Sequence, residues 1–242
     1  MHRFPDLHIW GLLGDSFAPS DTGTFFARVA ELVSPAETDD SAQVYPYEEK
    51  TDGWSRGEVI KAQSLRDLIT GGSGVKLGGS TGNRRIHYKD LPVTATLHAT
   101  ADVSLLPAYD LWVPGDRFNP DGSSPETTFE THVEQAIGLA IAVYNTADVE
   151  YSYGFAQQGR RPLDEHPDRD ALTTGEIPFV DWLVILPPHL VESIGRTHVL
   201  DLPAWRVIEL DDGSVCLVSH ENPTEQGIES RQQVTEYLRR GN

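Results

Sequence analysis

Hydrophobic and polar positions along this chain follow two different periods. The run Leu7–Gly14 is almost continuously apolar and predicts a buried strand near the N-terminus. Between Val93 and Ala99, apolar residues alternate with threonine and histidine, the period of two that is typical of a strand with one buried face. From Phe129 to Tyr144, apolar residues recur about every four positions. This third pattern predicts a long helix.

A start signal stands directly before that helical pattern. Ser124 can cap the first turn, and Pro125 suits the first helical position because it needs no hydrogen-bond donor there. We therefore expect the long helix to begin after residue 124.

The other segments predict shorter elements. The glycine-rich stretch Gly71–Asn83 is expected to be a loop. The Asp212-Gly213 dipeptide is typical of a tight hairpin turn, and Gly195 of a helix end. The remaining expected elements are helices over Ser20–Val33, Ser64–Ile69, Pro187–Gly195 and Arg231–Arg240, and strands over Ala42–Tyr47, Trp54–Ala62, Tyr109–Val113, Val149–Phe155, Val199–Leu210 and Ser214–Ser219. The apolar stretch Phe179–Leu186 leads into the helix that starts at Pro187.

The order of these elements favours one fold class. Strands are grouped in hairpins, and few strand–helix–strand units alternate. We therefore predict an α+β fold with a mainly antiparallel sheet, a long helix after residue 124 and a short C-terminal helix. Residues 1–242 are expected to form a single domain, with a possible subdivision near residues 71–84.

The charge balance limits the classes of partner. The chain has 37 acidic and 19 basic residues, a net charge of −18. Such a surface repels phosphates and anionic lipids, so neither nucleic acid nor a membrane is an expected partner. The acidity fits either salt adaptation in a halophile or a face made for a basic protein partner. The sequence leaves both explanations open, as well as the oligomeric state.

The N-terminus and the single cysteine indicate a compartment. No apolar window is long enough for a membrane span, and the first residues do not have the pattern of a signal peptide. Because Cys216 is the single cysteine of the sequence, no intramolecular disulfide can form. We therefore expect a cytoplasmic protein.

One short motif suggests catalysis. Gly14-Asp15-Ser16-Phe17 follows an apolar strand and resembles the first block of Gly-Asp-Ser lipases and esterases, in which that serine is the nucleophile. The segment Asp164-Glu165-His166 departs from the Asp-x-x-His spacing of that family. The alternative interpretation is a strand-end turn in which Asp15 and Ser16 bond local backbone. Ser16 and His166 are the catalytic candidates of this alternative.

Cofactor and metal patterns are absent from the sequence. The glycine-rich stretch has neither the P-loop spacing nor the GxGxxG spacing of phosphate-binding loops. In particular, Lys76 is followed by Leu77, where a P-loop has serine or threonine. Nine histidines are scattered without an HxxxH or HxH pair. We therefore expect no cofactor and no metal.

The last third of the chain carries a family resemblance. A strand ending in Tyr153-Gly154-Phe155 is followed by a charged loop and then by Val180-Asp181-Trp182-Leu183, Leu186-Pro187-Pro188 and Ile194-Gly195. A hairpin with the Asp212-Gly213 turn, Asn222-Pro223 and a terminal helix complete the order. Over about residues 130–240 this arrangement is similar to the C-terminal region of immunity proteins of bacterial polymorphic-toxin and type VI secretion systems.

The resemblance implies a non-catalytic function. Such a protein would neutralise a toxin domain by stoichiometric binding, and acidic loops would steer it towards a basic toxin. The polar segment Gln157–Ile177 is the candidate surface. Two alternatives remain: a structural or accessory protein of a virus or mobile element in a halophile, and a serine hydrolase using Ser16. The candidate partner-binding residues are Asp164, Glu165, Asp168, Asp170 and Glu176.

Overall fold

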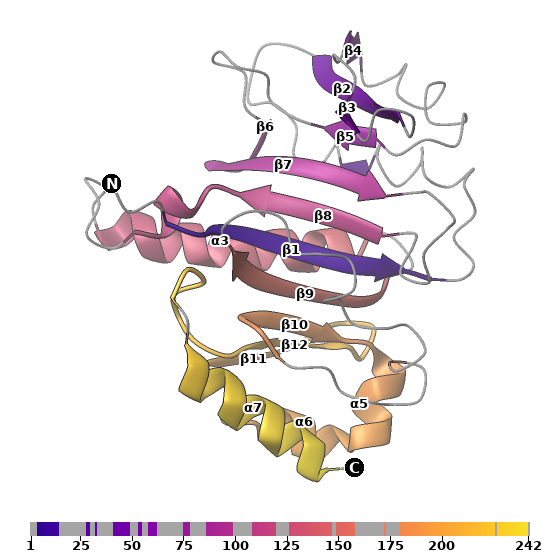
Figure 1. The fold of residues 1–242 in the computed structure, drawn as a ribbon. Coiled ribbons are helices and arrows are strands. Elements are labelled where there is room, and N and C mark those ends of the chain that lie inside the picture. The colour runs from indigo at the N-terminus through magenta and orange to yellow at the C-terminus, as the bar shows by residue number, and fades with distance from the viewer. Residues whose placement is uncertain are drawn as a thin grey trace.

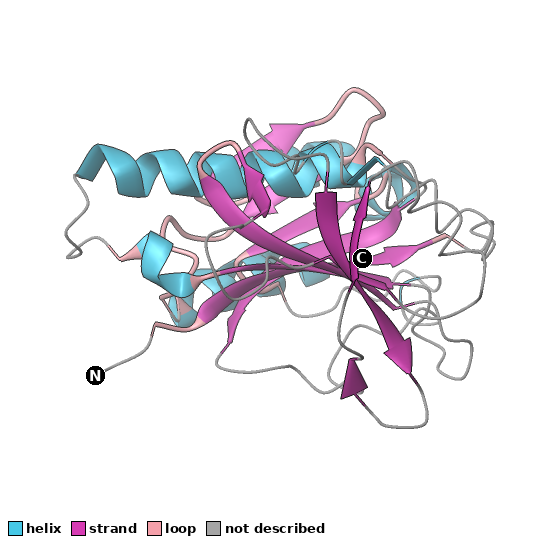
Figure 2. Cartoon of the chain, turned by 90° about the horizontal axis from the view of Figure 1, so that it is seen from above, coloured by secondary structure: helices cyan, strands magenta, loops and turns pink. Residues whose placement is uncertain are grey.

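The computed structural model describes residues 4–14, 28–29, 32, 41–48, 53–54, 58–61, 75–77, 86–98, 108–119, 126–146, 149–157, 172, 180–225 and 227–241. These residues form an antiparallel sheet with helices packed on both faces (Figures 1 and 2). The predicted α+β class with a mainly antiparallel sheet is confirmed.

Twelve strands join the sheet in the described part of the chain, and each pairing is antiparallel. Their spatial order is β11-β12-β10-β9-β1-β8-β7-β5-β2-β3, with β4 beside β2 and β6 beside β7. The strands are β1 (Asp6–Leu13), β2 (Ser41–Glu48), β3 (Gly53–Trp54), β4 (Glu58–Lys61), β5 (Val75–Leu77), β6 (Ile86–Tyr88), β7 (Leu91–His98), β8 (Ala108–Val113), β9 (Val149–Gln157), β10 (Leu183–Leu186), β11 (Arg206–Glu209) and β12 (Val215–Val218).

The helices cover the two faces unequally. The long helix α3 (Glu126–Tyr144) lies on one face, while α5 (Pro188–Ile194), α6 (Arg196–Leu200) and α7 (Ile228–Arg240) lie on the other (Figure 1). A 3-10 helix, η3 (Gly115–Phe118), follows β8. The predictions of a long helix after residue 124 and of a short C-terminal helix are confirmed.

Strand β1 explains why both faces are apolar. Leu7 and Ile9 belong to the core beneath α3, whereas Trp10 and Leu12 belong to the core beneath α5, α6 and α7. Because successive side chains of a strand point to opposite faces, a strand buried on both sides is a nearly continuous apolar run. This accounts for the pattern seen at Leu7–Gly14.

Tyr109 connects the three neighbouring strands β8, β1 and β9 beneath α3. Tyr109 on β8 pairs with Gly11 on β1, and its hydroxyl donates to Ser152 Oγ on β9 at 2.9 Å. The Ser152 hydroxyl in turn donates to the carbonyl of Trp10. A Cβ at position 11 would lie 2.4 Å from the tyrosine ring, so glycine is needed where the ring crosses β1.

The C-terminal third contains one error of the sequence prediction. The segment from Val199 to Trp205 was expected to begin a strand, but Val199 and Leu200 end α6 and the strand starts only at Arg206. Gly195 has φ 100°, which lets α6 begin immediately after α5 ends. The apolar residues of this segment therefore pack beneath the sheet from a helix and a turn.

The N-terminal half contains two further differences. Val75–Leu77, expected to lie in a loop, forms β5 and pairs with β2 and β7. The single strand expected over Trp54–Ala62 is replaced by the separate strands β3 and β4. Three-residue strands have too few positions to show a period of two, so the surrounding glycines dominated the pattern.

Several predictions fall wholly or mainly outside the described residues. Of the helix expected over Ser20–Val33, only Arg28, Val29 and Leu32 are described, and all three are helical. The helix expected over Ser64–Ile69 lies outside the described residues. The single-domain organisation and the possible subdivision near residues 71–84 stay predictions. Within the described ranges, no helix has the length and apolarity to cross a membrane.

Candidate binding cleft

A cleft of about 430 Å³ lies where the start of β1 and the end of β9 meet the C-terminal segment. Its walls come from the residue before β1, the end of β9, the loop that enters β10, and the turn that leads into α7. The lining residues are Pro5, Ala156, Gln157, Asp181, Trp182, His220, Pro223, Thr224, Glu225 and Arg231.

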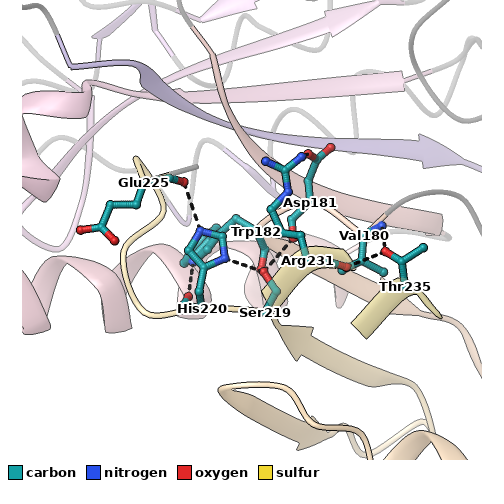
Figure 3. Close-up of polar contacts among 8 residues, drawn as sticks. All are labelled: Val180, Asp181, Trp182, Ser219, His220, Glu225, Arg231 and Thr235. Carbon is teal, nitrogen blue, oxygen red and sulfur yellow. Dashed lines mark hydrogen bonds and ion pairs between the residues drawn. The ribbon is translucent and has the colours of Figure 1, made fainter. Parts of the chain in front are cut away.

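A buried carboxylate lies at the base of the cleft. Asp181, which is 6% exposed, accepts a hydrogen bond from Arg231 Nη2 on the first turn of α7 (Figure 3). Next to this ion pair, the backbone N–H of Val180 donates to Thr235 Oγ1 at 3.0 Å. Burying a charge costs free energy unless it is paired. These contacts therefore fix α7 against the loop that enters β10.

Trp182 forms the back wall of the cleft. Its indole Nε1 donates to the carbonyl of His220 at 2.9 Å, and its backbone N–H donates to the carbonyl of Gly154 at the same distance. Trp182 is a core residue, since it is 1% exposed. Side chain and backbone of Trp182 together thus join the segment after β12 to β9.

Ser219 and His220 form a polar pair at the end of β12. Ser219 Oγ lies 2.7 Å from His220 Nδ1, and it also lies 2.8 Å from the carbonyl oxygen of Asp181 (Figure 3). On the other side of the ring, His220 Nε2 lies 3.2 Å from the carbonyl oxygen of Glu225. Carbonyl oxygens only accept, so the ring proton on Nε2 donates to Glu225.

This pair differs from a catalytic serine–histidine–acid arrangement in two ways. The partner of His220 Nε2 is the Glu225 backbone carbonyl, because the Glu225 carboxylate instead accepts from Asn222 Nδ2 at 3.1 Å. Ser219 is only 3% exposed, and its Oγ lies 2.8 Å from the carbonyl oxygen of Asp181 and 3.1 Å from that of Trp182. A nucleophile must reach its substrate. The geometry fits a role in fixing the cleft wall.

The protonation of His220 is set by opposing influences. Partial burial lowers the pKa of His220, and the positive charge of Arg231 acts in the same direction. The hydrogen bond to the Glu225 carbonyl and the carboxylates of Glu225 and Asp181 oppose this shift. The net result is a pKa below the usual value for histidine, which favours a neutral ring at neutral pH.

Metal ligation has no geometric support in the described ranges. No three histidine, cysteine, aspartate or glutamate side chains among the residues that the structure places lie together in a group that could hold an ion. The expected absence of a metal and of a cofactor stays a prediction.

The candidate residues named from sequence are not among the described residues. Ser16 and His166, the alternative catalytic pair, lie outside them, as do the candidate partner-binding residues Asp164, Glu165, Asp168, Asp170 and Glu176. The described residues that flank the second group nevertheless reach the cleft. Gln157, at the end of β9, and Asp181, before β10, both line it.

Sequence reasoning missed Asp181, His220 and Arg231 as members of one site. Asp181 was the one signal available, because it interrupts the apolar stretch Phe179–Leu190. A carboxylate within a buried segment requires a partner. Nothing in the sequence identifies that partner as Arg231, which is 50 positions away.

Comparison with known proteins gives a structural likeness without a sequence match. No family model matches the sequence, and no curated protein matches it. Among solved structures, the fold is similar to the Pseudomonas aeruginosa T6SS protein PA0821, a protein of a type VI secretion system. The TM-score is 0.54 at 11% sequence identity, and the match covers 99% of this chain and 74% of that chain. This chain therefore shares its fold with a type VI secretion protein.

Proposed function

We propose that this chain is a non-catalytic, immunity-like protein that neutralises a toxin by stoichiometric binding. The observation that carries the proposal is the likeness to a T6SS protein, which extends over 99% of the chain. The sequence resemblance to immunity proteins covers about residues 130–240, and the same region supplies every lining residue of the cleft except Pro5. Both likenesses involve proteins of type VI secretion systems.

The charge of the chain supports a basic toxin as the partner. A net charge of −18 attracts a basic surface over a distance of about one Debye length, which is about 8 Å at physiological ionic strength. Complementary charge mainly raises the rate of association. A basic nuclease-like domain fits this requirement.

The proposed contact surface is the polar segment Gln157–Ile177, which carries charges of both signs, together with the cleft. Asp164, Glu165, Asp168, Asp170 and Glu176 belong to that segment. Gln157, the first residue of the segment, and Asp181, which comes after the segment in the sequence, line the cleft. We include the cleft in the proposed surface for this reason.

Stoichiometry is the test that separates binding from catalysis. We expect the product of the gene beside that of this chain to arrest growth when it is expressed in a bacterial host, and co-expression of this chain to restore growth. In vitro, the toxin's activity should fall linearly and reach zero at one equivalent of this chain. Complete inactivation at a small fraction of an equivalent would show that the chain acts catalytically and would contradict the proposal.

Matched variants locate the surface. Neutralising Asp164, Asp168 and Asp170 to asparagine should slow association by about tenfold or more at low salt. A control variant removes the same charge elsewhere, at exposed Asp116, Glu130 and Glu236. An equal effect of both variants would indicate general attraction and would exclude the segment as the specific surface.

A further inference from the structure

Strand β11 forms one border of the sheet. It pairs with β12 on one side, and no strand of the described residues pairs with its other side (Figure 1). The far border, near β3 and β4, is built from strands of two and four residues. An unpaired strand edge exposes backbone donors and acceptors that can pair with another chain.

The register shows which backbone groups face outward. The Leu210 N–H donates to the Ser214 carbonyl, so Leu210 faces β12. In an antiparallel pair, inward and outward residues alternate, so Arg206 and Ile208 also face β12. The N–H and C=O groups of Val207 and Glu209 therefore point away from the sheet. They present the spacing that an added strand requires.

An exposed aromatic side chain stands at the start of this edge. Trp205 is 37% exposed, and the guanidinium of Arg206 lies 4.4 Å from its ring centroid. Arg206 forms an ion pair with Glu134 of α3 on the opposite face. Trp205 can thus contact a bound segment while Arg206 stays occupied within the chain.

The rim of this edge is acidic. Arg196 forms ion pairs with both Glu192 and Glu209, so each arginine of the rim already has an acidic partner. The exposed acidic residues outnumber the arginines by five to two. The rim consists of Glu134, Glu192, Glu209, Asp211 and Asp212, with Arg196 and Arg206.

We propose that β11 accepts an extended, basic segment of a partner protein as an added strand. Val207 and Glu209 supply the backbone pairing, Trp205 the apolar contact, and the acidic rim the selection for lysine and arginine. A second copy of this chain is disfavoured as the occupant, because edge-to-edge pairing would bring two acidic rims together. This inference rests on the proposed function, because the added basic strand is taken to belong to the neutralised toxin.

Amide hydrogen exchange on the full chain tests the edge without the toxin. The probe is a synthetic peptide of alternating lysine and valine, and its control has N-methyl groups on alternate amides, which keeps the charge but blocks strand pairing. We expect saturating peptide to slow exchange at the Val207 and Glu209 amides by about tenfold or more, and the methylated peptide to leave it unchanged. No slowing, or equal slowing by both peptides, would overturn the proposal.

Two substitutions at one position separate backbone pairing from side-chain loss. V207P removes the outward N–H without touching the hydrogen bonds to β12, since proline is tolerated at strand edges. V207A retains the N–H but loses more apolar side chain. We expect peptide binding, measured by fluorescence anisotropy, to weaken at least about tenfold for V207P and less than about threefold for V207A. Equal weakening would contradict strand addition, and if V207P does not fold, the exchange measurement decides.

The toxin assay distinguishes failure of this inference from failure of the proposed function. If V207P neutralises the toxin as well as the wild-type chain does, β11 is not the docking edge, but the immunity-like function stands. If the wild-type chain does not bind the toxin at all, the proposed function fails, and the peptide measurements still decide whether β11 accepts a basic strand.

Discussion

The indole of Trp182 packs directly on Gly154. A Cβ at position 154 would lie 3.1 Å from Trp182 Cε3 and 3.3 Å from Leu183 Cβ. The same two residues are joined by a hydrogen bond from the Trp182 N–H to the Gly154 carbonyl. Both belong to the motifs that carry the family resemblance, and the close approach of ring and backbone gives the glycine a physical role.

Replacing Gly154 with alanine should therefore destabilise the chain. To admit the methyl group, the buried indole or β10 must shift by a few tenths of an ångström, and overpacking of this kind costs about 1–3 kcal/mol. Urea denaturation followed by tryptophan fluorescence measures the loss. Gly138→Ala on α3 is the matched control, because its Cβ would meet only the end of the Tyr88 side chain and alanine favours a helix. A G154A variant as stable as the control would show that the packing is not tight.

Loss of Arg231 should loosen α7. Arg231→Met leaves the carboxylate of Asp181, which is buried, without this cationic partner. We expect a loss of about 1–3 kcal/mol in the free energy of unfolding, less than for a fully buried pair because Arg231 is partly exposed to solvent. Arg239→Met, on the exposed side of the same helix, should change stability by less than about 0.5 kcal/mol. Similar losses for both variants would rule out the ion pair as the anchor.

His220 should make the chain less stable in mild acid. Its pKa is lowered in the folded state, so the unfolded chain binds the proton first as the pH falls below about 6.5. The stabilisation present above that pH is thus lost as the pH falls towards the folded-state pKa. In His220→Gln, the free energy of unfolding should fall less between about pH 7.5 and about pH 5 than in the wild-type chain.

The control for this pH dependence is His189→Gln, which removes an exposed histidine from α5. It should retain the wild-type dependence when both variants are followed by chemical denaturation at each pH. A steeper fall in H220Q than in the wild-type chain would reverse the predicted sign and refute the assignment.

Cys216 should resist thiol reagents until the sheet opens. It is fully buried on β12 between β10 and β11, and burial raises the pKa of its thiol to about 12. The thiolate fraction at neutral pH is then on the order of a thousandfold smaller than for an ordinary cysteine. Labelling by an aromatic disulfide should be complete within minutes in denaturant and far slower in the native chain. Rapid native labelling would show that β11 separates readily from β12.

Salt should stabilise the chain. A net charge of −18 gives self-repulsion in the compact state, and ions screen it. We expect the melting temperature to rise between about 0.1 M and about 1 M KCl, measured by circular dichroism. Sucrose at equal osmolality controls for general solute effects. A melting temperature that is constant or falls with KCl would argue against the salt-adapted interpretation of the acidity.

The sequence predicted the elements with strong periodicity and missed those without it. The apolar repeat from Phe129 to Tyr144 predicted α3, and the Asp212-Gly213 dipeptide predicted the hairpin turn, where Gly213 has φ 89°. The strand expected over Val199–Leu210 failed in its first part. A few apolar residues can face a core from a helix or from a strand, so the pattern at Val199 and Leu200 was ambiguous.

The binding cleft could not be predicted to the same extent. Asp181 and Arg231 meet only because β10 enters the sheet beside β9 while α7 returns across its face. Ser219 and His220 reach the same place from the end of β12. Local periodicity reports which face of an element is buried, but it contains no information on which distant element covers that face.

The sequence by itself determined that Leu7–Gly14 would contain a buried strand, that a long helix would follow residue 124, and that the chain would be strongly acidic. These properties depend on side-chain chemistry and near neighbours alone. Only the tertiary structure decided that β11 would lie at the border of the sheet, and that Asp181 would face Arg231. Those relationships arise from pairing between strands and helices far apart in the chain, which is set by the packing of the whole sheet.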